Sequence, residues 1–257
     1  MISHHDERRA LEVSAESGLN VESGRIDFGP HVSRVKIDVG LSVNAPQSAV
    51  WLGADPSLAV IGLEPVTENI NALKAGQDDW PTRLDPSLIG ERFFLIPVAL
   101  ANVTQIERGT MFVTSVDTGR SSLLEPQEFG VMAEEPVEIW PLALLLSSLM
   151  WESIPFVDHL KIDAQGLDLD IVKSAGDLIH RVLAVTAEPE VGQYKSAQNS
   201  AAELANHMKS VGFVEVHRFM RRYHPRMWKV EVTDPTYVNP ELYFSHRPSS
   251  LFLYQRG

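Results

Sequence analysis

The sequence predicts one α/β domain with a doubly wound, mostly parallel Rossmann-like sheet and antiparallel C-terminal strands. Apolar runs of strand length alternate with helical patterns over most of the chain, which is typical of consecutive βαβ units. The 257 residues, 44% of them hydrophobic, suffice for one large core. After Gly212, three β-leaning runs follow one another without a helical pattern between them, which favours antiparallel pairing.

Each element has its own signal. The parallel strands are expected at the apolar runs 35–40, 59–65, 93–100, 158–163 and 181–188. Helices are expected between them at 67–75, where Thr67 can act as a cap, and at 142–151, 168–179 and 200–213. The C-terminal strands are expected at 213–220, 227–233 and 241–248. We expect residues 1–257 to form a single domain, with an N-terminal extension over 1–30 that starts in a disordered tail and a strand and loop insert over 109–139.

The charge and composition exclude several classes of function. With 34 acidic and 22 basic residues the net charge is -12, which disfavours binding to nucleic acid or to an anionic membrane surface. The absence of cysteine excludes thiolate catalysis and Cys-ligated zinc, and no two histidines have the i, i+4 spacing of a helical zinc site, so no metal is predicted. The charged N-terminus and the short apolar run 140–151 favour a cytoplasmic protein without membrane contact.

The turn after the first strand indicates the ligand. It keeps Asp38 and Gly40, but Ser42 and the Asn44-Ala45 pair stand where a dinucleotide fingerprint needs glycines for the pyrophosphate and for helix packing. A nucleoside ligand without phosphates, such as S-adenosylmethionine, removes the first of these demands. Glu64 ends the second strand, where an acidic side chain can accept hydrogen bonds from both ribose hydroxyls. The expected cofactor-binding residues are Asp38, Gly40, Ser42, Asn44, Glu64, Ala99 and Asn102.

Three stretches between Val35 and Phe244 resemble the FkbM-type methyltransferases. "IGLEPVTENINAL" is similar to the family's Phe-Glu-Pro-x-x-x-Asn segment, "IPVALAN" to the end of its third strand, and "HLKIDAQGLDLDIVKSA" to its Lys-Ile-Asp-x-(Glu or Gln)-Gly block. The chain departs from the family in the first turn, where "DVGLSVNAP" replaces Asp-x-Gly-Ala-Asn-x-Gly. The resemblance implies a class I methyltransferase fold, S-adenosylmethionine as the cofactor and methylation of a hydroxyl group.

The fourth strand supplies the candidate catalytic residues. Alternation places Lys161 and Asp163 on one side of this strand, at the carboxyl edge where ligands bind in such sheets. Asp163 is our first candidate for the general base that takes the hydroxyl proton, and Glu188, at the end of the fifth strand, is the second. Three alternatives stay open: Lys161 forms a structural ion pair, Asp163 caps the following helix, or Asp163 and Glu188 hold a divalent cation.

The insert supplies the candidate substrate-binding residues. Arg120, Ser121 and Ser122 follow a turn signal in a segment that could fold over the strand ends, or could be an exposed loop. The predicted function is an S-adenosylmethionine-dependent O-methyltransferase (EC 2.1.1 class) acting on a small molecule or glycan, and we also allow for a homodimer. The alternatives are a catalytically silent nucleoside-binding or interaction protein and an NAD-dependent oxidoreductase.

Overall fold

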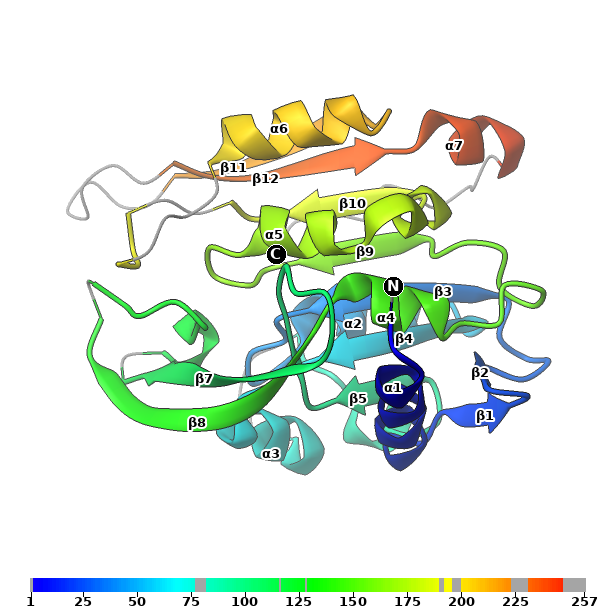
Figure 1. The fold of residues 1–257 in the computed structure, drawn as a ribbon, viewed down its shortest axis with the longest axis horizontal. Coiled ribbons are helices and arrows are strands. Elements are labelled where there is room, and N and C mark those ends of the chain that lie inside the picture. Colours follow the sequence, from blue (N-terminus) through cyan, green and yellow to red (C-terminus); the bar gives the residue numbers. More distant parts are fainter. Residues whose placement is uncertain are drawn as a thin grey trace.

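A seven-stranded sheet organises the chain in the computed structural model, which describes residues 2–76, 82–115, 117–127, 129–189, 192–195, 200–222 and 231–246 (Figure 1). The strand order is β11-β12-β10-β9-β3-β4-β5. Strands β5, β4, β3, β9 and β10 run parallel, whereas β12 is antiparallel to both β10 and β11. The strands of this sheet are β3 (Arg34–Val39), β4 (Leu58–Leu63), β5 (Phe93–Ile96), β9 (His159–Ile162), β10 (Ala184–Ala187), β11 (Val214–Arg222) and β12 (Glu231–Val238). The predicted fold class, a doubly wound, mostly parallel Rossmann-like sheet with antiparallel C-terminal strands, is confirmed.

Helices cover both faces of this sheet. They are α1 (His4–Glu16), α2 (Pro46–Ala54), α3 (Thr67–Ala75), α4 (Leu142–Ser147), α5 (Asp168–Ser174), α6 (Ala201–Ser210) and α7 (Pro240–His246), with the 3₁₀ turns η1 (Pro86–Leu88), η2 (Thr118–Arg120) and η3 (Gly176–Arg181). Helices α1, α4 and α5 lie on one face (Figure 1), and their apolar side chains share one core cluster with the strands. Helix α2 packs against a second cluster through Trp51 and Leu52. Within the described ranges, no helix combines the length and the apolar character that a membrane span requires.

Two smaller sheets complete the architecture. Strands β1 (Asn20–Glu22) and β2 (Arg25–Asp27) form a hairpin after α1. Strands β7 (Glu107–Thr114) and β8 (Val131–Trp140) form a long antiparallel hairpin, and the short strand β6 (Ala99–Leu100) pairs with β8 in the order β6-β8-β7. In Figure 1 this hairpin curves away from the main sheet beside α3. The segment between its strands contains η2 and returns toward the main sheet.

The strand expected at 93–100 is interrupted, and this correction matters for the site. The chain leaves the main sheet after Ile96, and β6 starts at Ala99 in the other sheet. Pro97 explains the break, because a proline has no N–H to donate to the ladder and fixes its own φ. After Ile96 the chain therefore pairs with the β7–β8 hairpin instead, and residues 98–100 line the pocket described below.

Three other expectations also need correction. The strand expected at 241–248 is wrong, because residues 240–246 form α7: the Asn239 side chain accepts the Glu241 N–H at 3.1 Å, and Pro240 occupies the first helical position. The disordered tail is wrong as well, because Ser3 caps α1 by accepting the N–H of Asp6. The helix expected at 142–151 ends at Ser147. Part of the strand expected at 227–233 lies outside the described residues.

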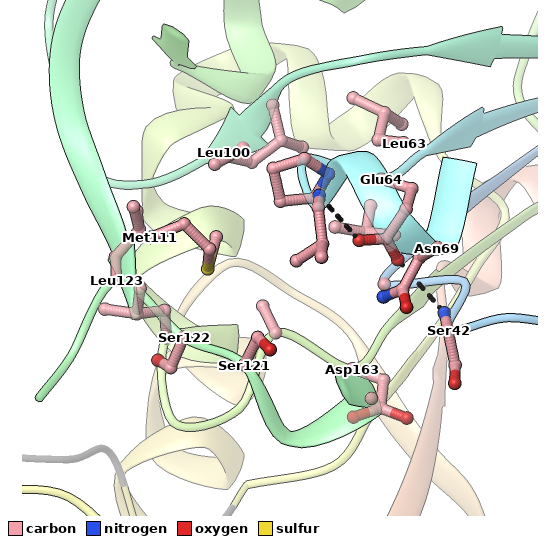
Figure 2. Close-up of a pocket in the computed structure, with 18 of the residues that line it drawn as sticks. Ser42, Leu63, Glu64, Asn69, Leu100, Met111, Ser121, Ser122, Leu123 and Asp163 are labelled. Atoms are coloured by element: carbon pink, nitrogen blue, oxygen red, sulfur yellow. Dashed lines mark hydrogen bonds between the residues drawn. The ribbon is translucent and has the colours of Figure 1, made fainter. Parts of the chain in front are cut away.

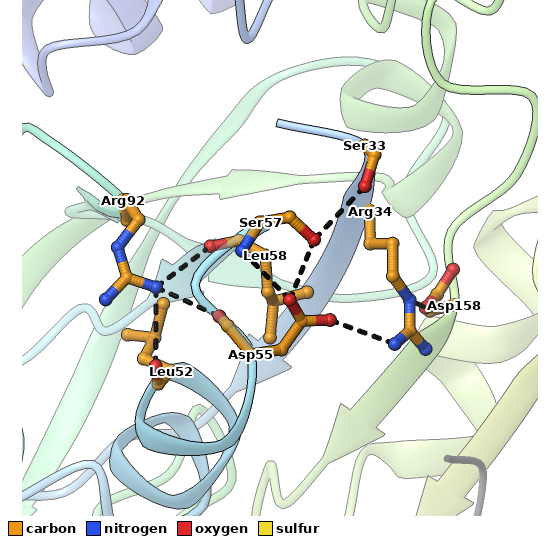
Figure 3. A network of polar contacts seen from close by, with 8 residues as sticks. All are labelled: Ser33, Arg34, Leu52, Asp55, Ser57, Leu58, Arg92 and Asp158. Atoms are coloured by element: carbon orange, nitrogen blue, oxygen red, sulfur yellow. Dashed lines mark hydrogen bonds and ion pairs between the residues drawn. The ribbon is translucent and has the colours of Figure 1, made fainter. Parts of the chain in front are cut away.

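A polar network joins the amino ends of three strands, at the edge opposite to the pocket (Figure 3). Arg34, which begins β3, forms ion pairs with Asp55 after α2 and with Asp158 before β9. Asp55 also accepts the N–H and hydroxyl of Ser57, and Arg92 donates to three carbonyl oxygens around the end of α2. The network fixes the relative positions of β3, β4, β9 and α2, whose other ends form the candidate site.

Candidate functional site

A pocket of about 590 Å³, counting its open mouth, lies at the carboxyl ends of β3, β4 and β9 (Figure 2). This is the edge at which open α/β sheets bind ligands. Its opposite wall comes from β6, β7 and the segment after η2. The lining residues are Val39, Gly40, Ser42, Leu63, Glu64, Pro65, Val66, Asn69, Val98, Ala99, Leu100, Met111, Thr118, Gly119, Ser121, Ser122, Leu123, Asp163, Ala164 and Leu167.

Gly40 is required where β3 meets β9. Its φ is +77°, and a Cβ atom built on it would lie 2.0 Å from the carbonyl oxygen of Asp163. Side chains are therefore excluded by both the backbone angle and the neighbouring strand. Further along the turn, Ser42 and Ala45 have φ values of 55° and 42°, so the turn keeps left-handed positions although glycine is absent from them.

Glu64 holds this turn from the end of β4. Its Oε2 accepts the backbone N–H of Leu41 at 3.1 Å and of Ser42 at 3.0 Å, and its Oε1 accepts the N–H of Val66 at 3.0 Å. Burial raises the pKa of Glu64 to about 7, although these amides and the side chain of Asn69 favour the charged form through hydrogen bonds. The N–H groups that a phosphate-binding turn would offer to a ligand are thus occupied by a carboxylate of the same chain.

A charged row lies below the pocket. Asp38 and Lys161 are paired in register on β3 and β9, with 3.5 Å between Oδ1 and Nζ. Asp38 is 1% exposed and also accepts the Ser48 hydroxyl at 2.6 Å. Burial raises the pKa of Asp38, and the charge of Lys161 opposes that rise. Lys161 also donates to the Gly40 carbonyl oxygen at 2.9 Å and lies 3.5 Å from Asp163, so it supports the turn rather than lining the pocket.

Asp163 follows β9 and lines the pocket with 28% of its side chain exposed. It does not cap the next helix, because α5 begins after Leu167 without a side-chain cap. Its Oδ1 accepts the amide of Gln165 at 2.7 Å. Gln165 is held by two hydroxyls. That of Tyr194 donates to the Gln165 side-chain oxygen Oε1 at 2.8 Å, and that of Ser122 donates to the Gln165 backbone carbonyl oxygen at 2.9 Å. Asp163 is therefore held in place by the insert while its carboxylate faces the cavity.

The segment after η2 folds over the strand ends, as the sequence allowed. Ser121 and Ser122 line the pocket, and the Ser121 oxygen accepts the N–H of Thr114 at 3.2 Å. Gly119 lies so close to the first turn that an added Cβ atom would be 2.8 Å from the Ser42 hydroxyl oxygen. The Arg120 guanidinium instead stacks over the ring of Phe129, 4.9 Å from its centroid, and is not among the lining residues.

Several other predicted site residues lie outside the pocket. Asp38, Asn44 and Lys161 are not among the lining residues, and the backbone carbonyl oxygen of Asn44 accepts the N–H of Leu84 at 2.8 Å. Asn102 is exposed beyond β6. Glu188 is buried after β10, where its N–H donates to Asp168. Of the expected cofactor-binding residues, the pocket brings together Gly40, Ser42, Glu64 and Ala99.

Sequence reasoning missed most of the apolar lining and two polar residues, Asn69 and Thr118. Met111 and Leu123 come from the insert, and no local sequence pattern indicates that they line a pocket with the end of β4. Asn69, in the first turns of α3, is 1% exposed and lines the pocket next to Glu64. Its signal was present in the "EPVTEN" stretch, five residues after Glu64. Over the described part of the chain, no three His, Asp or Glu side chains are grouped so that they could hold a metal ion.

Comparison with family models and with curated proteins gave no match. Among solved structures, the chain is similar to magnesium protoporphyrin IX methyltransferase from Synechocystis PCC 6803 with bound SAM, at 10% identity and a TM-score of 0.43, covering 91% of this chain and 78% of that one. It is also similar to precorrin-6y C5,15-methyltransferase from Geobacter metallireducens, at 10% identity and a TM-score of 0.39, over 90% and 86% of the two chains. A third match is a 16S rRNA adenine methyltransferase from Catenulisporales acidiphilia, at 9% identity and a TM-score of 0.37, over 91% of each chain.

Proposed function

We propose that the pocket binds the nucleoside part of S-adenosylmethionine and that the protein transfers the methyl group to a hydroxyl of a small molecule or glycan. One observation carries the proposal: the turn after β3 has no free N–H group at Leu41 or Ser42 for a phosphate. The backbone N–H groups of Leu41 and Ser42 donate hydrogen bonds to Glu64, and the described lining of the pocket contains no Lys, Arg or His side chain. A pyrophosphate would find neither amides nor cations there, which disfavours the NAD-dependent alternative.

The other walls suit the same ligand. Val98, Leu100, Met111 and Leu123 form an apolar surface between the two sheets, and such a surface fits the faces of a purine. Glu64 lies at the end of β4, on the side where the ribose is expected. Gly40, Ser42 and Ala99 bring backbone and small side chains close to the ligand. Asp38 and Asn44 support this turn from outside the pocket in the proposal.

Methyl transfer to an alcohol needs alignment and the removal of one proton. Bound S-adenosylmethionine supplies an activated methyl group, so the chain has to orient the acceptor hydroxyl and accept its proton. Asp163 is the more exposed of the two carboxylates that line the cavity, its Oδ2 lies 3.5 Å from Lys161 Nζ, and it is the general base in this proposal. Ser121 and Ser122 line the pocket with Asp163; the Ser122 hydroxyl already donates to the Gln165 backbone carbonyl oxygen, so Ser121 is the hydroxyl assigned to the acceptor side. Glu188 and Arg120 do not line the pocket and are given no contact with the reacting groups.

A binding experiment tests the nucleoside part. Calorimetric titration with S-adenosylhomocysteine, S-adenosylmethionine and NAD should show binding of the first two and none of NAD. Glu64→Gln should weaken binding of S-adenosylhomocysteine about tenfold or more, because a neutral amide cannot hold the N–H groups of Leu41, Ser42 and Val66 as the carboxylate does, and the turn beside the ligand loosens. Glu68→Gln, the same change at an exposed position of the neighbouring helix α3, should leave the affinity unchanged. Tight binding of NAD alone would refute the proposal.

A labelling experiment tests the transfer. Incubation with methyl-labelled S-adenosylmethionine and extracts of the source organism should label material that survives nuclease treatment and is lost with Asp163→Asn. Label on RNA or DNA alone would assign a different acceptor class. Binding of the cofactor without any labelled product would favour the catalytically silent alternative.

A further inference from the structure

Asn69 is a buried polar side chain whose hydrogen bonding is incomplete. It lies in α3, is 1% exposed and lines the pocket next to Glu64 (Figure 2). Among the described residues, its Oδ1 atom has no hydrogen-bond partner. Buried amide oxygens are normally paired, so an unpaired one in the wall of a pocket indicates that a donor arrives with the ligand.

Glu64 has little acceptor capacity left for that donor. A carboxylate offers about four acceptor positions. The N–H groups of Leu41, Ser42 and Val66 fill three of them, and a hydrogen bond with the Asn69 side chain engages the carboxylate as well. Glu64, which the sequence predicted to bind the ribose, thus orients the Asn69 side-chain amide. The Asn69 Oδ1 atom remains the acceptor without a partner beside Glu64.

We propose that Asn69 is a specificity-determining residue that accepts a hydrogen bond from a ribose hydroxyl of the bound nucleoside. The inference rests on the proposed function, and it moves part of the ribose recognition from β4 to α3. Glu64 holds the turn and positions the Asn69 amide, and the two side chains together face the vicinal diol. The pocket therefore selects ribonucleosides over nucleosides that lack one of the two hydroxyls.

The opposite interpretation is that Asn69 only fastens α3 to the end of β4. In that case removal of the Asn69 side chain would lower the stability of the protein and would weaken the binding of every nucleoside by the same factor. The two interpretations differ in how the effect of the variant depends on the ligand. If Asn69 accepts a hydrogen bond from a ribose hydroxyl, removal of that hydroxyl weakens binding to the wild type but has little further effect on a variant that already lacks the Asn69 oxygen.

The experiment is a cycle of ligands and variants measured by calorimetry. The ligands are S-adenosylhomocysteine and its 2′-deoxy and 3′-deoxy forms. The proteins are the wild type, Asn69→Leu, which is similar in size, and Asn71→Leu, which makes the same change at an exposed position of α3. In the wild type and in Asn71→Leu, removal of one of the two hydroxyls should weaken binding about tenfold. In Asn69→Leu that penalty should fall to about twofold or less.

Equal deoxy penalties in Asn69→Leu and in the wild type would overturn the inference and would leave the proposed function standing. A wild type that binds none of the three ligands would refute the proposed function, and the inference with it. Asn69→Ser, with a smaller polar side chain, provides a second variant if the leucine variant melts too early to be titrated. It should show the same loss of discrimination, because its shorter side chain leaves the hydroxyl out of reach.

Discussion

Lys161 and Asp38 form an ion pair between neighbouring strands, with 3.5 Å separating Nζ of the lysine from Oδ1 of the buried aspartate. Lys161 also donates to the carbonyl oxygen of Gly40 and lies near Asp163. The Lys161 ammonium group therefore connects the buried Asp38, the turn at Gly40 and the candidate base Asp163. The structural alternative for Lys161, an ion pair inside the sheet, is what the geometry supports, and its influence on Asp163 is one of position.

Lys161→Met should lower the free energy of unfolding at pH 8 by about 3 to 5 kcal/mol, because it leaves the Asp38 carboxylate buried without its counter-charge. Adding Asp38→Asn should restore part of this loss, since the neutral amide needs no counter-charge. Chemical denaturation of the two variants and of the exposed control Lys173→Met measures the effect. Equal stabilities of the wild type and Lys161→Met would show that the pair is not coupled.

Asp163→Asn should lower the rate of methyl transfer about 10²-fold or more and leave the melting temperature and the affinity for S-adenosylhomocysteine close to those of the wild type. The amide keeps the shape of the carboxylate but cannot accept a proton. Asp177→Asn, an exposed change, serves as the control. Near-normal turnover of a folded Asp163→Asn enzyme would remove Asp163 from the chemistry.

Glu64 should make stability depend on pH between its unfolded and folded pKa values. Burial raises the folded pKa to about 7 from an ordinary value of 4.5, so the native state binds more protons than the unfolded state in this interval. The contribution of Glu64 to the free energy of unfolding is therefore fully present below pH 4.5. It falls as the pH rises toward 7, by up to about 1.4 kcal/mol per pH unit. The stability difference between wild type and Glu64→Gln isolates the group.

That difference should favour the wild type more at pH 5 than at pH 8, because glutamine imitates the protonated carboxyl but does not titrate. Unfolding in urea at the two pH values gives the comparison. A difference that stays constant across this range would mean that Glu64 titrates outside it.

Gly40→Ala should destabilise the protein by about 2 to 4 kcal/mol, from the positive φ and from the overlap of the new methyl group with the Asp163 carbonyl. Gly53→Ala is the matched control, because Gly53 lies in α2 with no atom within 4 Å of the added Cβ, and alanine there should stabilise the helix slightly. Thermal melting of both variants measures the contrast, and similar melting temperatures would contradict the role assigned to Gly40.

The fold could be predicted from local patterns, whereas the pocket could be predicted only in part. Apolar runs predict strands β3, β4, β9 and β10. The location of Gly40, Glu64 and Asp163 in one site is predicted by the rule that parallel strands have their carboxyl ends at one edge of the sheet. Met111 and Leu123 could not be found in this way, because their place depends on how the β7–β8 hairpin packs against Val66 and Ala99. Asn102 lies outside the pocket because the chain leaves the main sheet after Ile96.

The errors in secondary structure have similar causes. The apolar run 93–100 has the composition of one strand, and the consequence of a single proline inside it was underestimated. Residues 240–246 are rich in β-favouring aromatics, but the Asn239-Pro240 pair is a helix start, and the cap determined the outcome. In both places a backbone constraint outweighed the preference of the side chains.

The small sheet gives one wall of the pocket a separate attachment. Strand β6 pairs with β8 at two positions, Ala99 with Ile139 and Leu100 with Trp140, and the rest of the hairpin makes its ladder within itself. Insertions or deletions in the hairpin would change the reach of that wall and leave the registers of all seven main strands untouched. Exchange of one hairpin can therefore reshape one wall of the pocket, while the strand ends that carry Gly40, Glu64 and Asp163 keep their positions.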